Sequence, residues 1–165
     1  MSTALLWTPA YIGLGSNLDE PARQIDAAVA GLEQLLDTVL VAVSRRYRSR
    51  PVGPQDQPDF LNAAAALVTR LNASALHQEL RELERRLGKR PPPVLNGPRR
   101  IDLDLLVFGD ESVTSAALTV PHPRLHERAF VLYPLAELAP ALWIPGRGRV
   151  ATLRNAIVGD TLALQ

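Results

Sequence analysis

Two aspartates, Asp102 and Asp104, have the residue type and spacing of a divalent-metal site. Residues 101–108 are mostly Ile, Leu, Val and Phe, which predicts a β-strand. Side chains alternate between the faces of a strand, so both carboxylates point to one face, with Cα atoms ~6.6 Å apart. Two like charges ~4 Å apart repel by ~4 kcal/mol at an effective dielectric constant of about 20. Mg²⁺, bound together with phosphate oxygens, would offset this repulsion, and Arg99 could reach the same phosphate.

The same alternation also occurs in an antiparallel sheet with one solvent-exposed face, where both aspartates would be ordinary surface residues. The residues before the strand favour the metal site. Between Arg81 and Arg100 there are seven basic residues against two acidic ones, although the net charge of the whole chain is only +1. The low net charge excludes a generally polycationic protein, and the basic segment indicates a specific anionic ligand.

The composition is that of an ordinary globular protein. The chain has 165 residues, of which 47% are hydrophobic and 21% are charged, enough to form a core and too few charges for a disordered protein. We expect a single domain over residues 1–165. Cysteine is absent, which excludes disulfides and thiolate metal sites. No signal-peptide pattern and no apolar run of ~18 residues is present, so we expect a cytoplasmic protein without a membrane partner.

The hydrophobic periodicity predicts a core of four strands and two helices. The strands are expected at residues 10–14, 39–43, 60–68 and 101–108, and the helices at residues 21–36 and 73–87. Their order, β-α-β-β-α-β, predicts an α+β, ferredoxin-like split βαβ fold, with two helices on one face of an antiparallel sheet. The first strand and the aspartate strand are expected to lie side by side in the middle of the sheet.

The segments outside this core are predicted to be loops and a C-terminal extension. Two irregular loops, residues 49–59 and 89–96, should gather over the aspartates. Residues 111–114 should pair beside the aspartate strand, and residues 125–138 should be helical, with Pro134 ending or kinking that helix. The extension should contain a strand near residues 142–144 and a short helix over residues 151–158.

Four motifs in a fixed order give the chain a recognisable resemblance. They are Y-I-G-L-G-S-N at residues 11–17, G-P-Q-D-Q-P-D-F-L-N at 53–62, G-P-R-R-I-D-L-D-L-L at 97–106 and V-P-H-P-R-L-H-E-R-A-F-V-L at 120–132. Over about residues 11–140 the chain resembles the 6-hydroxymethyl-7,8-dihydropterin pyrophosphokinases of folate biosynthesis. Members of that family transfer the βγ-pyrophosphoryl group of ATP to the hydroxymethyl oxygen of the pterin and release AMP.

The resemblance implies a role for each matching residue. Asp102 and Asp104 would hold two Mg²⁺ ions and, with Arg99, carry the catalysis. Phe60 and Phe130 would sandwich the flat pterin, and Asn62 would read its edge. The backbone around Ser49 and Val52 would complete the pterin site. The residues expected to face ATP are Arg81, Glu84, Lys89, Arg99, Thr119, His122 and Arg128. The partners would be these two small molecules, and the protein would be a monomer.

One loop departs from the family pattern. Pro91 and Leu95 stand where many members have arginines, and Asn96 stands where an aromatic residue is common. Lys89 and Arg90 would then take over part of their role in closing the loop over ATP.

Two other functional classes remain open from the residues alone. A nucleic-acid-binding module would need aromatic residues on the sheet, and only Phe60 and Phe108 are candidates. A metal-dependent phosphohydrolase would use Asp102 and Asp104 to activate water.

Overall fold

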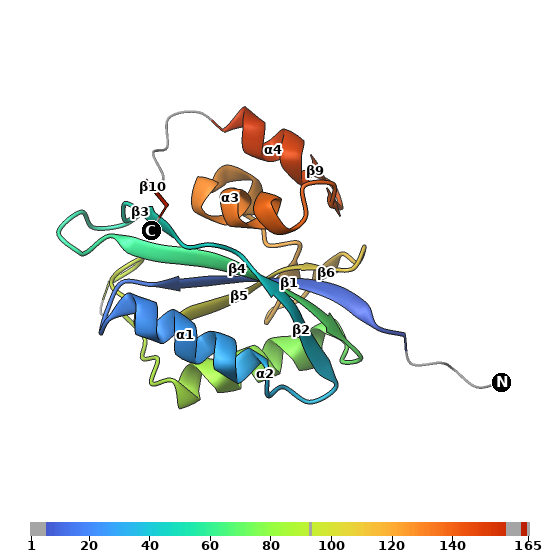
Figure 1. Cartoon of the computed structure of the whole chain (residues 1–165), viewed down its shortest axis with the longest axis horizontal. Coiled ribbons are helices and arrows are strands. Elements are labelled where there is room, and N and C mark those ends of the chain that lie inside the picture. The colour runs from blue at the N-terminus through green and yellow to red at the C-terminus, as the bar shows by residue number, and fades with distance from the viewer. Residues whose placement is uncertain (1–5, 93, 158–162, 165) are drawn as a thin grey trace.

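The computed structural model describes residues 6–92, 94–157 and 163–164, and its centre is a six-stranded antiparallel sheet (Figure 1). The strand order is β10-β3-β4-β1-β5, and β2 also pairs with β4. The strands are β1 (Thr8–Ser16), β2 (Thr38–Val43), β3 (Tyr47–Ser49), β4 (Phe60–Thr69), β5 (Asp102–Phe108) and β10 (Ala163–Leu164). The predicted α+β fold with its βαββαβ core order is confirmed.

Helices cover both faces of the sheet: the two predicted core helices share one face, as expected, and the later helices, for which no face was predicted, cover the other. Helices α1 (Pro21–Leu32) and α2 (Ala73–Arg86) lie on one side, and α3 (Ala129–Leu138) and α4 (Val150–Ala156) lie on the other (Figure 1). The core is divided accordingly into two clusters. The first contains Leu76, Leu80 and Leu103, and the second contains Leu106 and Leu132.

Short elements connect these layers. They are the hairpins β6 (Val113–Thr114) with β7 (Thr119–Val120) and β8 (Trp143–Ile144) with β9 (Gly148–Arg149), and a 3₁₀ turn, η1 (Leu125–Glu127). No helix in the described part of the chain is long and apolar enough to cross a membrane.

Several predicted details were wrong. Helix α1 ends at Leu32, short of the predicted end at Leu36, which is 77% exposed in the turn before β2. Strand β6 pairs with β7 instead of β5. Helix α3 continues past Pro134, so this proline does not end the helix, although it removes one backbone N–H from the helical hydrogen bonds. The last predicted helix spans Val150–Ala156, and Val158 lies outside the described residues.

Strand β5 is at the edge of the sheet, beside β1, and was predicted in its middle. Its side chains alternate as predicted, with Leu103 and Leu105 in the first core cluster. The register with β1 shifts after Leu105, which leaves Leu106 as an extra residue, a β-bulge. Leu106 and Val107 therefore both join the second cluster. The bulge thus places two consecutive side chains of β5 in the same cluster, where a regular strand would place one.

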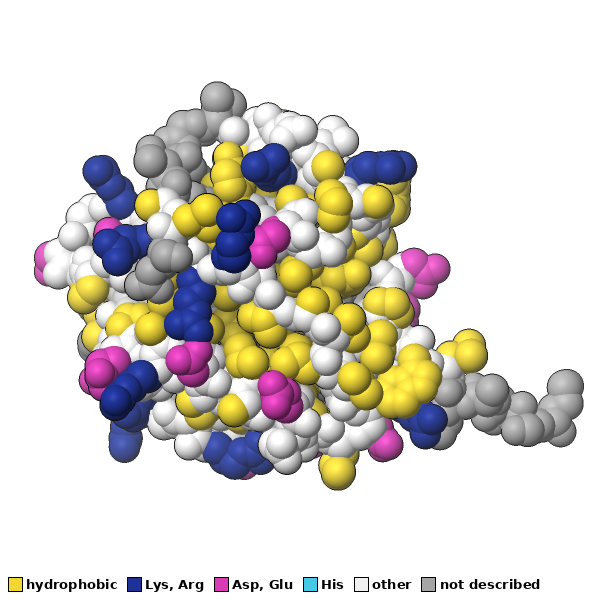
Figure 2. Space-filling model, viewed as in Figure 1, with side chains coloured by type: hydrophobic (Ala, Val, Ile, Leu, Met, Phe, Trp, Pro, Cys, Tyr) yellow, Lys and Arg dark blue, Asp and Glu magenta, His cyan; other side chains and the backbone are white. Residues whose placement is uncertain are grey.

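Hydrophobic side chains are also exposed along β2. Figure 2 shows them gathered on the face of the molecule that lies over β2 and β4. Val39, Val41 and Val43 of β2 are 49%, 60% and 37% exposed. The pairing of β2 with β4 shifts between Leu40 and Ala42, so this strand carries a bulge of the kind that twists an edge away from other chains.

Candidate active site

A pocket lies where β1, β4 and β5 meet the start of α3, and it collects residues that are far apart in the sequence. Nine of the residues predicted from the sequence line it: Ser49, Val52, Phe60, Asn62, Arg99, Asp102, Asp104, Arg128 and Phe130. All five residues predicted to bind the pterin are in this set. Gly13 and Gly15 of β1 also line it, and both stand in the first family motif.

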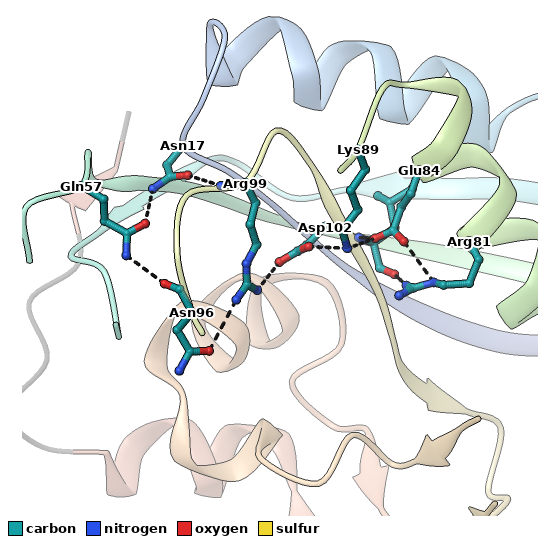
Figure 3. Close-up of polar contacts among 9 residues, drawn as sticks. Asn17, Gln57, Arg81, Glu84, Lys89, Asn96, Arg99 and Asp102 are labelled. Carbon is teal, nitrogen blue, oxygen red and sulfur yellow. Dashed lines mark hydrogen bonds and ion pairs between the residues drawn. The ribbon is translucent and has the colours of Figure 1, made fainter. Parts of the chain in front are cut away.

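Asp102 is held between two cations at the edge of this pocket (Figure 3). Lys89 Nζ lies 2.6 Å from Oδ1, and Arg99 Nη1 lies 2.6 Å from Oδ2. Burial alone would raise the pKa of Asp102, but Lys89 and Arg99 outweigh it and hold the pKa below its ordinary value. The side chain of Asp102 is only 14% exposed, so it is not a solvated surface residue.

Asp104 has no such compensation. No residue in the described ranges forms an ion pair or a hydrogen bond with its side chain. Burial, together with the negative charge of Asp102, raises the pKa of Asp104, while His122 and Arg81 act in the opposite direction. An uncompensated carboxylate beside a paired one is an arrangement that a bound cation would stabilise.

Glu84 and Arg81 lie outside the pocket lining, against the open edge of β5. Glu84 is 3% exposed, and its Oε2 accepts hydrogen bonds from the Leu103 backbone N–H at 2.8 Å and from Lys89 Nζ at 2.9 Å. Arg81 donates to the Leu103 carbonyl oxygen, and its Nε lies 3.1 Å from Glu84 Oε1. Burial raises the pKa of Glu84 despite these partners. In this structure Glu84 therefore positions Lys89 and does not face the pocket.

Three amide side chains that the sequence analysis did not assign connect the loops around the pocket (Figure 3). Asn17 donates to Gln57 Oε1 at 2.9 Å and accepts from the Arg99 backbone N–H at 2.8 Å. Gln57 donates in turn to the Asn96 carbonyl oxygen at 2.9 Å. Asn17 and Gln57 belong to two of the four motifs, which is the signal that could have identified them. Asn96 lines the pocket at the position where the family often has an aromatic residue.

The side of the pocket around Asn62, which the resemblance assigns to the pterin, is held together by neutral hydrogen bonds. The amide nitrogen of Asn62 donates to the Tyr47 carbonyl oxygen at 3.1 Å and to Ser49 Oγ at 2.8 Å. Both of its donors are thus used, and only Oδ1 remains to meet a ligand. Oδ1 lies 3.5 Å from the place where a Cβ of Gly15 would stand, which is an ordinary van der Waals distance, so this part of β1 lies directly beside Oδ1.

The remaining predicted residues lie in the chain after β5, where Thr119 and His122 fall outside the pocket lining. Thr119 is exposed on β7, and the backbone N–H of His122 donates to the Leu106 carbonyl oxygen at 2.9 Å. Burial lowers the pKa of His122, so this ring is neutral at pH 7, although the charge of Asp104 opposes the shift. The guanidinium of Arg128 lies 5.5 Å from the centre of the Phe130 ring. Burial and Arg124 lower the pKa of Arg128 from its ordinary value.

Comparison with known proteins identifies the family. The family model for 7,8-dihydro-6-hydroxymethylpterin-pyrophosphokinase matches residues 11–140. The chain belongs to this pyrophosphokinase family. A relative from Pseudomonas aeruginosa, a 2-amino-4-hydroxy-6-hydroxymethyldihydropteridine pyrophosphokinase, is 50% identical over 135 residues, covering 82% of this chain and 83% of the relative. The Haemophilus influenzae protein of the same name is 45% identical over 136 residues, covering 82% and 84%.

Family membership establishes the activity of this pyrophosphokinase. It transfers a pyrophosphoryl group to hydroxymethyldihydropterin in folate biosynthesis, with ATP as co-substrate. The comparisons thus favour the transferase over the nucleic-acid-binding module and the phosphohydrolase.

Solved structures agree on the fold. Plasmodium falciparum HPPK-DHPS A437G with SDX-DHP matches with a TM-score of 0.70 at 12% identity, covering 93% of this chain and 46% of that chain. A second structure, HPPK-DHPS in complex with substrates, matches with a TM-score of 0.72 at 12% identity, covering 91% and 43%. The pyrophosphokinase chain described here thus spans less than half the length of these two proteins, and the likeness shows a shared fold.

Proposed function

We propose that this pyrophosphokinase requires Mg²⁺ and that Asp102 and Asp104 hold two Mg²⁺ ions on the face of β5 that opens into the pocket. The observation that carries the proposal is the pair of neighbouring carboxylates, of which Asp104 lacks a cationic partner among the described residues. Mg²⁺ takes one or two carboxylates and completes its coordination with water and substrate phosphates. No group of three metal-binding side chains is found in the described part of the chain, which suits a metal brought in with a triphosphate.

Bound Mg²⁺ would supply charge neutralisation for the triphosphate and orient its oxygens. Lys89 and Arg99, which hold Asp102 in this structure, are within reach of the same phosphates. Their positive charges stabilise the negative charge that develops during transfer. Arg128 and His122 contribute further donors, and Glu84 acts indirectly, by fixing Lys89. Arg81 and Thr119 remain candidates for contacts with the nucleoside.

On the other side of the pocket, Phe60 and Phe130 hold the pterin ring between them, and Asn62 Oδ1 accepts a hydrogen bond from its edge. The hydroxymethyl oxygen then forms a bond to the β-phosphorus of ATP, and its proton is released to the solvent. The bond between the β-phosphorus and the oxygen bridging to the α-phosphorus breaks, and AMP leaves with that oxygen. The protein contributes mainly by positioning these atoms and by electrostatics.

We further propose that the chain acts as a monomer and as a single domain. A cytoplasmic location belongs to the same proposal, because ATP is supplied there.

The test supplies the purified protein with ATP, Mg²⁺ and 6-hydroxymethyl-7,8-dihydropterin and identifies the nucleotide product. AMP that forms only when the pterin is present, and only until the metal is removed with a chelator, supports the proposal. Phosphate or ADP formed without pterin would show hydrolysis and contradict it. Size measurement by light scattering in the same buffer tests the monomer.

A further inference from the structure

The atom proposed to read the pterin, Asn62 Oδ1, owes its orientation to a strand of only three residues. An amide can rotate by 180° and exchange its oxygen with its nitrogen, which would present donors instead of an acceptor. Here the two acceptors of β3, the Tyr47 carbonyl oxygen and Ser49 Oγ, take both N–H groups of Asn62. Asn62 is 4% exposed and Ser49 is 7% exposed, so water does not compete strongly for these groups.

Strand β3 is itself held from three directions. It pairs with β4 through Tyr47↔Asn62 and Ser49↔Phe60. On its other edge it pairs with β10, through Arg48↔Ala163 and Tyr47↔Leu164.

The third support comes from the α3 layer. The Tyr47 hydroxyl lies 2.6 Å from Glu137 Oε1, and the rings of Tyr47 and Tyr133 meet edge to face with centres 6.5 Å apart. A three-residue strand is too short to hold its place by one ladder alone, so each support contributes to its position.

We propose that Ser49 is a positioning residue for the pterin, acting through Asn62, and that β10 is a clamp that keeps β3 in the place where it orients this amide. The inference rests on the proposed pterin site and adds to it a function for the end of the chain. Both side chains of β10 are exposed, so β10 acts through its backbone and not by filling the core. The clamp should influence pterin binding and leave ATP binding unaffected, because Lys89 and Arg99 approach from other elements.

The first experiment is a mutant cycle on Ser49 and Asn62. Ser49→Ala removes one of the two acceptors and should raise the KM for the pterin about three- to tenfold, the effect of one hydrogen bond, while the KM for ATP stays within about twofold. Ser49→Thr keeps the hydroxyl and should recover most of the affinity. In an Asn62→Ala background, Ser49→Ala should add no further loss, because the residue through which it acts is gone.

The second experiment uses the full-length chain with Ala163→Pro and Leu164→Pro together. Proline has no backbone N–H and cannot donate to the ladder with β3. The matched control carries threonine at the same two positions, which keeps both N–H groups and favours strands. The proline variant should raise the pterin KM about threefold, the order of one lost hydrogen bond, and the threonine variant should not.

The outcomes distinguish a wrong pterin site from a wrong positioning role of Ser49 and β10. If Asn62→Ala leaves pterin binding intact, the proposed pterin site is wrong. If Asn62→Ala weakens it while Ser49→Ala and the proline pair do not, the site stands and the positioning role is refuted. Equal increases in the KM values for pterin and ATP in the proline variant would indicate general loosening of the fold and would also refute the clamp.

Discussion

The two walls of the pocket are built in opposite ways. On the pterin side, Asn62 and Ser49 lie on adjacent strands and are joined by a neutral hydrogen bond of 2.8 Å. On the phosphate side, Lys89 and Arg99 come from the chain between α2 and β5, and both form ion pairs with Asp102 at 2.6 Å.

The difference indicates which wall must change when substrates bind. The pterin wall already has its acceptor oriented and free, so it is preorganised and little ordering is needed on binding. On the phosphate wall the charges are already paired with one another, because both cations form ion pairs with the carboxylate that is proposed to bind Mg²⁺. These ion pairs have to be exchanged for contacts with phosphate and metal. The predictions below test this contrast in order of decreasing effect.

The largest effect is expected from the carboxylates. Asp102→Asn and Asp104→Asn should each lower kcat by about a thousandfold or more, because charge stabilisation at the phosphates is lost. Product formation from ATP and pterin measures this. Retained turnover in either variant would overturn the metal assignment.

The same two variants should differ in stability, which sharpens the contrast. The raised pKa of Asp104 means that the folded state disfavours its charge, so Asp104→Asn should raise the midpoint of thermal unfolding. Asp102→Asn leaves Lys89 and Arg99 without their partner and should lower it. Calorimetry at pH 7 compares them. Equal shifts would show that the two carboxylates do not have different environments.

Glu84→Ala should have the largest effect on stability. It leaves the Leu103 N–H without its acceptor and removes one of the two carboxylates that hold Lys89 Nζ, and breaking such a buried pair costs about 3 kcal/mol in the free energy of unfolding. Urea unfolding measures this cost. The matched control is Glu82→Ala on the same helix, where the ion pair with Arg85 is exposed and a much smaller change in the free energy of unfolding is expected. Similar costs in both variants would contradict the proposed role of Glu84.

A smaller effect is expected on the pterin wall. Asn62→Ala should raise the pterin dissociation constant about tenfold through the loss of one buried acceptor and should change ATP binding far less. Isothermal titration with each substrate separately measures both. Equal losses for the two substrates would remove Asn62 from the pterin site.

The smallest effect concerns the support of β3. Burial alone would raise the pKa of Glu137, but the Tyr47 hydroxyl and Arg45 hold it below the ordinary value of 4.5. A carboxyl with a lowered pKa stabilises the fold above its unfolded pKa, and this contribution is lost as the pH falls through the folded value. Glu137→Gln should therefore weaken the decrease of the unfolding midpoint below about pH 4.5, measured by circular dichroism. An unchanged pH profile would show that this contact does not stabilise the fold.

The core of the fold was predictable because periodicity is local. The alternation in residues 101–108 placed Asp102 and Asp104 on one face, and the leucine spacing located α2, which begins after the Asn72 cap. The position of β5 at the sheet edge and the second helical layer were not predictable in the same way. Both depend on how distant strands pair. The bulge at Leu106, which places Leu106 and Val107 in the same cluster, cannot be recognised from the residue pattern.

The candidate site was predictable where a residue type indicates a chemistry. The carboxylates and arginines were found by residue type and the aromatic residues by the family resemblance, and the pocket brings most of them together. The amides Asn17 and Gln57 were missed because amides occur on most surfaces, and only the structure shows their buried hydrogen bond. Glu84 was assigned to ATP through the resemblance alone, and its burial is not visible in the sequence.

Side chains of helix α2 occupy part of the open edge of the sheet at β5, where no further strand pairs in the described part of the chain. Glu84 takes the Leu103 N–H, and Arg81 takes the Leu103 carbonyl oxygen. A foreign strand that approached β5 at this point would find both backbone groups already occupied, so β-sheet extension from one molecule to the next is blocked beside Asp102 and Asp104. The enzyme can thus keep its working strand at the rim of the sheet, open to substrates, without exposing it to self-association.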